Sequence, residues 1–199
     1  MSDILKLAAI LGLIAVIASG SLAVVNRATK PRIEAYKAQQ QARARKEVLP
    51  AAEEGVYVST DEASDFPYYV GYAHADTTEP VGYVFLAFGK GYSSTIEMVV
   101  GVDLAGTVTG ISIVGQQETP GLGAKITEVR YGESGAWFQR QFKGKTVSQL
   151  LVDKDGGEID SITGATISSR AVTRGVRTAL ARLEAKRRTA ETQSSQRKP

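Results

Sequence analysis

A long uncharged stretch near the N-terminus constrains this chain more than any other feature. Residues 7–25 read LAAILGLIAVIASGSLAVV, nineteen residues without a charge, bounded by Lys6 and Arg27. As a helix this stretch would span about 28 Å, which matches the hydrocarbon core of a bilayer. We therefore expect a transmembrane anchor over residues 1–26. A cleaved signal peptide is the alternative, because small residues follow the apolar centre, although the apolar stretch continues past them.

Charge is distributed unevenly along the 199 residues. Residues 1–50 carry eight Lys and Arg against three Asp and Glu, and residues 170–199 carry nine against two. The segment between them is acidic, with seven basic and sixteen acidic residues. A nucleic-acid-binding protein would spread basic residues over its folded body, so this pattern argues against that class. The chain has no cysteine, so disulfides and thiolate-bound metals are excluded. It has one histidine, His74, so sites built from several histidines are excluded as well.

Residues 27–50 predict a polar helix that follows the anchor. Pro31 fits the first turn of such a helix, and Pro50 fits its stop. Between them Ala, Gln, Arg and Lys dominate, and large apolar residues are few. Because this leaves only a thin apolar face, we expect a stalk or a partner-packing helix and not a part of the core.

Residues 51–186 are expected to form an α+β domain, an antiparallel sheet with packed helices, preceded by the single transmembrane helix. Four runs rich in Val, Ile, Tyr and Phe are separated by turn sequences; they are YYVGYA, VGYVFLAF, STIEMVVGV and TVTGISIV. This spacing predicts an antiparallel meander, and strands followed by helices are typical of the class. The last helix has apolar residues at helical spacing from Ala171 to Leu183. Residues 187–199 are expected to be a disordered basic tail.

The sequence DSITGATISSR, residues 160–170, lies at the entrance of this last helix. Its small hydroxyl-bearing residues favour simple capping, by Thr166 or Ser168. The free N–H groups and the positive end of the helix dipole also suit a phosphate, and Gly164 and Ala165 leave room for one. The residues alone leave both interpretations open.

A second unusual sequence is QQETPGLGAKI, residues 116–126. Pro120 and Gly121 favour a type II turn, and Gly123 adds backbone freedom. Taken alone this is a turn, although such loops let a backbone approach a planar ligand closely. By contrast, the acidic residues of segment 153–160 lack the ligand spacing of a calcium loop and are interpreted as a solvated turn.

Together these two sequences resemble the FMN-binding domain family. ETPGLGAKI is followed about forty residues later by DSITGATISS, which contains the family's [Ser/Thr]-Gly-Ala-Thr signature. GKGYSSTIEMVVGVD and WFQRQFKGK are similar to its other landmarks, and the resemblance covers nearly the whole chain. The single anchor and the length are most similar to the G subunits of Rnf electron-transport complexes, and next to the related C subunits of sodium-pumping NADH:quinone reductases. One departure is GYSST, where the family often has a second glycine in place of a serine, so the resemblance is not extended to ligand contacts from that loop.

The resemblance implies FMN as the cofactor, joined by a phosphoester to the final threonine of the signature. A dedicated flavin transferase would form that bond. Thr163, Gly164 and Ala165 would shape the turn around the phosphate, with Asp160 orienting it, and the loop of the second sequence would lie against the flavin ring. The residues implied at the cofactor are Thr166 as the esterified residue, Asp160, Thr163, Gly164, Ala165, Glu118, Thr119, Gly121, Leu122 and Gly123.

The implied function is electron relay in a membrane complex that couples ferredoxin and NAD oxidoreduction to ion translocation. This chain would act with other subunits and would turn over no substrate alone. The family places the domain on the extracytoplasmic side. The basic residues that follow the span favour the opposite orientation, but a domain of this size can cross despite them. A membrane-anchored ligand-binding or scaffold module without a covalent cofactor, and a flavin reductase acting on a soluble substrate, are the alternatives.

Overall fold

The computed structural model describes residues 2–52, 56–60, 65–74 and 76–196. These residues divide into two compact units, with the boundary between Gln40 and Gln41. The first unit is helical, and the second holds a sheet with further helices.

Helix α1 (Ser2–Val48) contains the whole uncharged stretch. Its apolar window is exposed, and α1 is the one helix in the described part of the chain that is long and apolar enough to cross a membrane. Pro31 lies inside α1, so the expectation that a separate helix begins there was wrong. Proline removes one backbone hydrogen bond, and the Ala, Gln, Arg and Lys residues after it favour helix strongly enough for α1 to continue. The helix ends before Pro50, as predicted.

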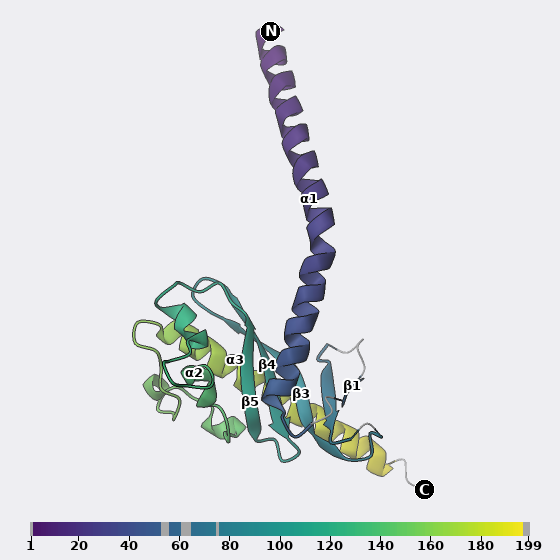
Figure 1. Ribbon diagram of the computed structural model, residues 1–199, viewed down its shortest axis with the longest axis vertical. Coiled ribbons are helices and arrows are strands. Elements are labelled where there is room, and N and C mark those ends of the chain that lie inside the picture. Colours follow the sequence, from purple (N-terminus) through teal and green to yellow (C-terminus); the bar gives the residue numbers. More distant parts are fainter. Residues whose placement is uncertain (1, 53–55, 61–64, 75, 197–199) are drawn as a thin grey trace. The chain divides into compact units, whose positions relative to one another are not determined.

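The predicted antiparallel meander is confirmed, and with it the α+β class. Five strands lie in the order β1-β2-β3-β4-β5, and each neighbouring pair is antiparallel (Figure 1). The longest strand, β3, is the middle one and pairs with β2 on one side and with β4 on the other. The strands are β1 (Val56–Thr60), β2 (Tyr68–Tyr72), β3 (Pro80–Lys90), β4 (Thr95–Asp103) and β5 (Val108–Gly115).

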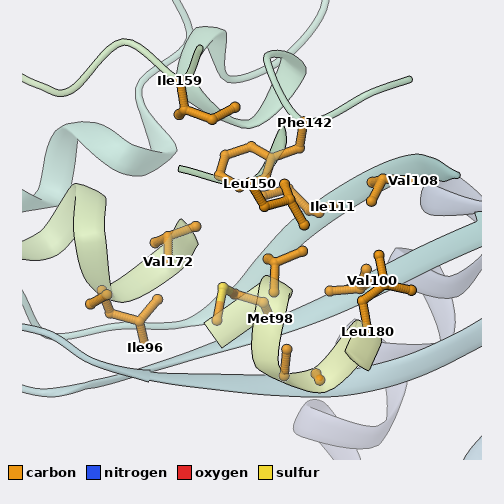
Figure 2. Packing of buried hydrophobic residues seen from close by; sticks show 14 of the residues in the cluster. Ile96, Met98, Val100, Val108, Ile111, Phe142, Leu150, Ile159, Val172 and Leu180 are labelled. Atoms are coloured by element: carbon orange, nitrogen blue, oxygen red, sulfur yellow. The ribbon is translucent and has the colours of Figure 1, made fainter. Parts of the chain in front are cut away.

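One face of the sheet packs against the C-terminal helix and the segment that precedes it. These elements are α3 (Thr166–Gln196), α2 (Trp137–Arg140) and the 3-10 turns η1 (Gly123–Thr127), η2 (Val147–Gln149) and η3 (Asp153–Asp155). Alternate residues of β4 point to this face because side chains alternate along a strand. Figure 2 shows Met98 and Val100 of β4 pointing toward Val172 and Leu180 of α3, with Phe142 completing the cluster. This is the main hydrophobic core.

The opposite face of the sheet is covered by the C-terminal end of α1. Leu49, which follows α1, is fully buried and lies over two glycines. A Cβ on Gly71 would come within 2.6 Å of Leu49 Cδ2, and one on Gly82 within 2.9 Å of Leu49 Cδ1. Gly71 and Gly82 are opposite each other in the register of β2 and β3. The two VGY sequences therefore form a socket for Leu49.

A second pair of glycines lies under Val48. Gly101 and Gly110 are opposite each other in β4 and β5, and a Cβ on Gly110 would lie 3.3 Å from Val48 Cα. Thr109 Oγ1 donates a hydrogen bond to the Val48 carbonyl, which has no partner within the helix. The expectation that residues 27–50 stay outside the core is thus wrong for the last turn of α1. Its apolar face is thin, but glycines in four strands let its backbone approach closely.

Helix α3 extends further than expected. It continues to Gln196, past the expected domain end at residue 186. The expectation of a disordered tail over residues 187–199 therefore differs from the structure up to Gln196, and residues 197–199 lie outside the described residues.

Leu49→Ala should lower the free energy of unfolding of the second unit by about 2–5 kcal/mol, because it empties a socket that glycines cannot refill. Ile33→Ala is the matched control, since Ile33 is 52% exposed and its truncation should change stability by less than about 0.5 kcal/mol. Denaturant unfolding of the full chain in detergent measures both. Equal effects of the two substitutions would contradict the packing of Leu49 on the sheet.

Candidate functional site

A cavity of about 540 Å³ opens where three segments distant in the sequence meet. They are the turn between β3 and β4, the loop after β5 and the start of α3. The cavity thus brings together the two unusual sequences of the chain. Its lining residues are Tyr92, Glu118, Thr119, Leu122, Gly123, Gly164, Ala165, Thr166, Ile167 and Ser168.

Thr166 is the first residue of α3, so the free N–H groups of the first turn lie at the cavity. Gly164 has a φ of 78°, a left-handed conformation that favours glycine. Ser169 fixes this turn, because its Oγ accepts a hydrogen bond from Ile162 N at 3.0 Å and donates one to Ala165 O at 3.1 Å. Thr166 is half-buried, and its hydroxyl has no hydrogen-bond partner among the described residues. That hydroxyl is available to a ligand.

Glu118 is the buried charged group of the site, with 5% of its surface exposed. Its Oε2 accepts hydrogen bonds from Tyr92 N at 3.0 Å and Ser168 Oγ at 2.5 Å. Its Oε1 accepts from the N–H groups of Ser93 and Ser94, both at 3.0 Å, and from Ser94 Oγ at 3.2 Å. Burial alone would raise the pKa of Glu118, but these hydrogen bonds outweigh it and lower the pKa below its usual value. Ser168 therefore bonds a buried carboxylate and does not act as the helix cap.

The ETPGLG loop folds as the tight turn that its sequence predicts. Gly121 has a φ of 75°, and Leu122 N donates a hydrogen bond to Thr119 O at 3.2 Å. Gly123 is required by close packing, because a Cβ there would lie 2.5 Å from Ser168 Oγ. The loop thus packs directly on the first turn of α3.

Three of the residues implied at the cofactor do not line the cavity; they are Asp160, Thr163 and Gly121. The backbone N–H and carbonyl of Asp160 are hydrogen-bonded to the Gln141 side chain at 2.7 and 3.3 Å. The Asp160 carboxylate has no hydrogen-bond partner within the described part of the chain and is exposed. The other seven implied residues lie together at the cavity.

Asp153 lies in the acidic segment that was interpreted as a solvated turn. Its carboxylate, and not that of Asp160, binds the backbone of the segment that precedes α3. Its Oδ1 accepts a hydrogen bond from Ser161 N at 3.0 Å. Hydrogen bonds from Ser161, from its side chain first and then its backbone, lower the pKa of Asp153 to about 2. The segment that leads into α3 is therefore fixed from η3.

Three lining residues are absent from the set that the sequence implies at the cofactor; they are Tyr92, Ile167 and Ser168. The exposed fractions of Tyr92 and Ile167 are 73% and 51%, so both lie at the mouth of the cavity. The sequence indicates Ser168 only as a cap, and because of the departure at GYSST no contact was expected from the loop of Tyr92. The feature of the sequence that could have indicated Ser168 and the loop of Tyr92 is Glu118, because a carboxylate buried in such a tight loop requires several hydrogen-bond donors nearby.

No Lys, Arg or His is among the described residues that line the cavity. Arg170, one turn into α3, is held by Asp155, with Nη2 and Oδ1 2.6 Å apart. A negatively charged group at the cavity would therefore be met by the N–H groups at the start of α3.

Comparisons with known proteins identify the family of this chain. The FMN-binding domain family matches residues 91–181, and the RnfG N-terminal region matches residues 1–48. The G subunit of the Na(+)-translocating ferredoxin:NAD(+) oxidoreductase complex from Acetobacterium woodii is 36% identical over 87% of this chain and 88% of its own. The chain belongs to the RnfG family. It is a membrane-anchored electron-transfer protein that binds FMN and works with other subunits of a complex.

Other relatives share this family. The G subunit of the ion-translocating oxidoreductase complex from Escherichia coli is 37% identical, with 85% of each chain covered, and its counterpart from Methanosarcina acetivorans is 34% identical, over 85% of this chain and 89% of its own. A solved structure of the C subunit of the Na(+)-translocating NADH-quinone reductase from Parabacteroides distasonis is 29% identical, with a TM-score of 0.45. The alignment covers 67% of this chain and spans 63% of that one.

Asp153→Asn should make the unfolding midpoint less dependent on pH between about 4 and 2. The pKa of Asp153 falls from an ordinary 3.8 to about 2, so its contribution to stability is present above 3.8 and is lost as pH falls through about 2. Thermal unfolding of wild type and variant at several pH values measures this, and the two curves should converge at the acid end. Asp160→Asn is the control and should change the midpoint at pH 7 little. A constant difference between wild type and Asp153→Asn at all pH values would contradict this account.

Proposed function

We propose that this member of the RnfG family relays electrons through FMN held by a phosphoester to Thr166, within an ion-translocating ferredoxin:NAD oxidoreductase complex. The name of the Acetobacterium woodii relative supports the coupling of ferredoxin, NAD and ion translocation. The observation that carries the attachment site is the free hydroxyl of Thr166, at the start of α3 and in the cavity that both unusual sequences line. FMN supplies the electron transfer, and the protein holds and shapes its surroundings.

The residues at the cavity fit an esterified phosphate. Thr166 Oγ1 would bond to phosphorus, while the phosphoanhydride bond of an activated flavin donor breaks and the hydroxyl proton leaves with the departing group. A flavin transferase would carry out this step. The N–H groups of the first turn of α3 and the positive end of its dipole suit the remaining charge of the phosphate. Gly164 and Ala165 add almost no side-chain bulk beside it.

The electrostatics of the lining support a covalent bond over simple binding. A phosphate monoester carries close to two negative charges at neutral pH, and the described lining contains Glu118 and no basic residue. Reversible binding of such an anion would therefore be weak. Esterification removes one of the two charges and makes attachment independent of affinity.

Thr166→Val should abolish covalent attachment of FMN, because valine has no hydroxyl to form the phosphoester. Valine has nearly the same shape as threonine, so the fold should be preserved. Thr178→Val is the matched control, since Thr178 belongs to the same helix α3 but is exposed, lies outside the signature and does not line the cavity. Each full chain is made together with a flavin transferase and analysed by intact mass and by in-gel flavin fluorescence after denaturation. Wild type and Thr178→Val should show the FMN adduct. A denaturation-resistant adduct in Thr166→Val would place the bond elsewhere.

We also propose that the FMN domain lies on the extracytoplasmic side of the inner membrane, as the family resemblance implies. A dissociated FMN could not be replaced from a local pool there, so a tether suits that compartment. The basic residues after the span are a weaker guide, because long domains cross the membrane largely regardless of flanking charge.

Ser134→Cys tests this orientation, since the chain has no cysteine of its own and Ser134 is exposed. A membrane-impermeant maleimide should label this variant in cells whose outer membrane has been opened. Asp3→Cys, at the other end of the span, should react only after the inner membrane is disrupted. The reverse labelling pattern would place the domain in the cytoplasm.

A further inference from the structure

We propose that Glu118 is a positioning residue that holds Tyr92 at the mouth of the flavin cavity, and that Tyr92 is the residue that contacts the flavin ring. This goes beyond the attachment at Thr166 and rests on the flavin lying in this cavity. Glu118 lines the cavity, but its carboxylate acts on the protein backbone and not on the cofactor.

The turn between β3 and β4 forms an anion-binding nest, and the chain fills it with its own carboxylate. Three successive N–H groups, those of Tyr92, Ser93 and Ser94, each donate to Glu118 at 3.0 Å. Successive N–H groups that converge in this way are a recurrent site for anions. Ser168 Oγ adds a bond from α3, so one carboxylate joins the turn, the ETPGLG loop and the last helix.

Both oxygens of Glu118 are fully used by these donors. Oε1 accepts three hydrogen bonds and Oε2 accepts two, and the residue is 5% exposed. A carboxylate oxygen offers about two lone-pair sites, so no acceptor capacity is left for a polar edge of the ring. Any hydrogen bond or stacking contact with the ring must therefore come from other lining residues.

Tyr92 is the one aromatic residue among the described residues that line the cavity. Its backbone is fixed by Glu118, yet its side chain is 73% exposed, although a large aromatic side chain on a soluble surface is usually buried in part. A planar ring at the mouth of a cavity can stack on a planar ligand. A phenol that contacts a flavin ring also quenches the fluorescence of the flavin. Glu118 thus sets the place of this ring through the Tyr92 N–H.

Glu118→Gln replaces one carboxylate oxygen by an NH2 group, so the donors that face that oxygen lose their acceptor while those of the other oxygen keep theirs. A nitrogen in the place of Oε1 would face two backbone N–H groups and a hydroxyl. In the place of Oε2 it would face one backbone N–H, that of Tyr92, and the Ser168 hydroxyl, which can rotate to accept. The amide should therefore take the second orientation, and Tyr92 N should be the group that loses its partner.

Hydrogen exchange of the flavin-free full chain tests the first step independently of FMN. The Tyr92 amide should exchange about tenfold faster in Glu118→Gln, while those of Ser93 and Ser94 change less. Ser168→Ala is the matched control, because it removes a bond to the same oxygen and leaves the Tyr92 bond in place. An unchanged Tyr92 amide in Glu118→Gln would overturn the proposal, even if covalent FMN at Thr166 is proven.

Flavin fluorescence per bound FMN tests the second step. Tyr92→Leu should brighten the FMN-loaded protein severalfold, and Glu118→Gln should brighten it in part. The double variant should be no brighter than Tyr92→Leu, because Glu118 acts through Tyr92 and the two effects are not additive. If Glu118→Gln changes the fluorescence equally in the Tyr92→Leu background, Glu118 acts on the flavin directly and the proposal fails.

Discussion

The burial of one carboxylate organises the functional half of this protein. A charge in the interior is tolerated only when hydrogen bonds satisfy it, and Glu118 meets this demand with five of them. The donors come from the β3–β4 turn and from the first turn of α3, while Glu118 itself belongs to the loop after β5. These three segments are far apart in the sequence, so satisfying the charge is what brings the walls of the cavity together.

Much of the fold could be predicted because it depends on local patterns. Alternating apolar residues and turn sequences identified the strands from Tyr68 onward, and helical spacing identified α3. The packing of Val48 and Leu49 could not be found in this way. Their partners are glycines in strands β2 to β5, and a glycine shows in the sequence as a turn signal, not as half of a contact. The short β1 and the 3-10 turns have too few residues to produce a pattern.

In the candidate site, too, the features that depend on local sequence could be predicted and those that depend on long-range contacts could not. The residues alone left both capping and a phosphate site open at the start of α3, where Thr166 lies, because a helix entrance rich in small residues is a local signal for either. Asp160 was expected to orient the turn before α3, but Asp153 is the carboxylate that binds it. This depends on how η3 folds back toward that turn, which no rule of residue spacing predicts. Ser168 and Tyr92 were missed because each matters only through Glu118, some fifty and twenty-six residues away in the chain. Their role follows from what a buried charge requires, once its position is known.

The β3–β4 hairpin carries both of the chain's special arrangements, one at each end. Its open end contains Gly82 and Gly101, on which the end of α1 packs, and its turn contains the N–H groups that bind Glu118. The extended strands between the two run for about seven residues in β4 and about ten in β3, which is roughly 23 to 33 Å. Groups that far apart, with no shared partner, affect stability independently. The residues that fasten the sheet to the end of the anchor helix can therefore vary without moving the cavity, and the cavity can be tuned without loosening that attachment.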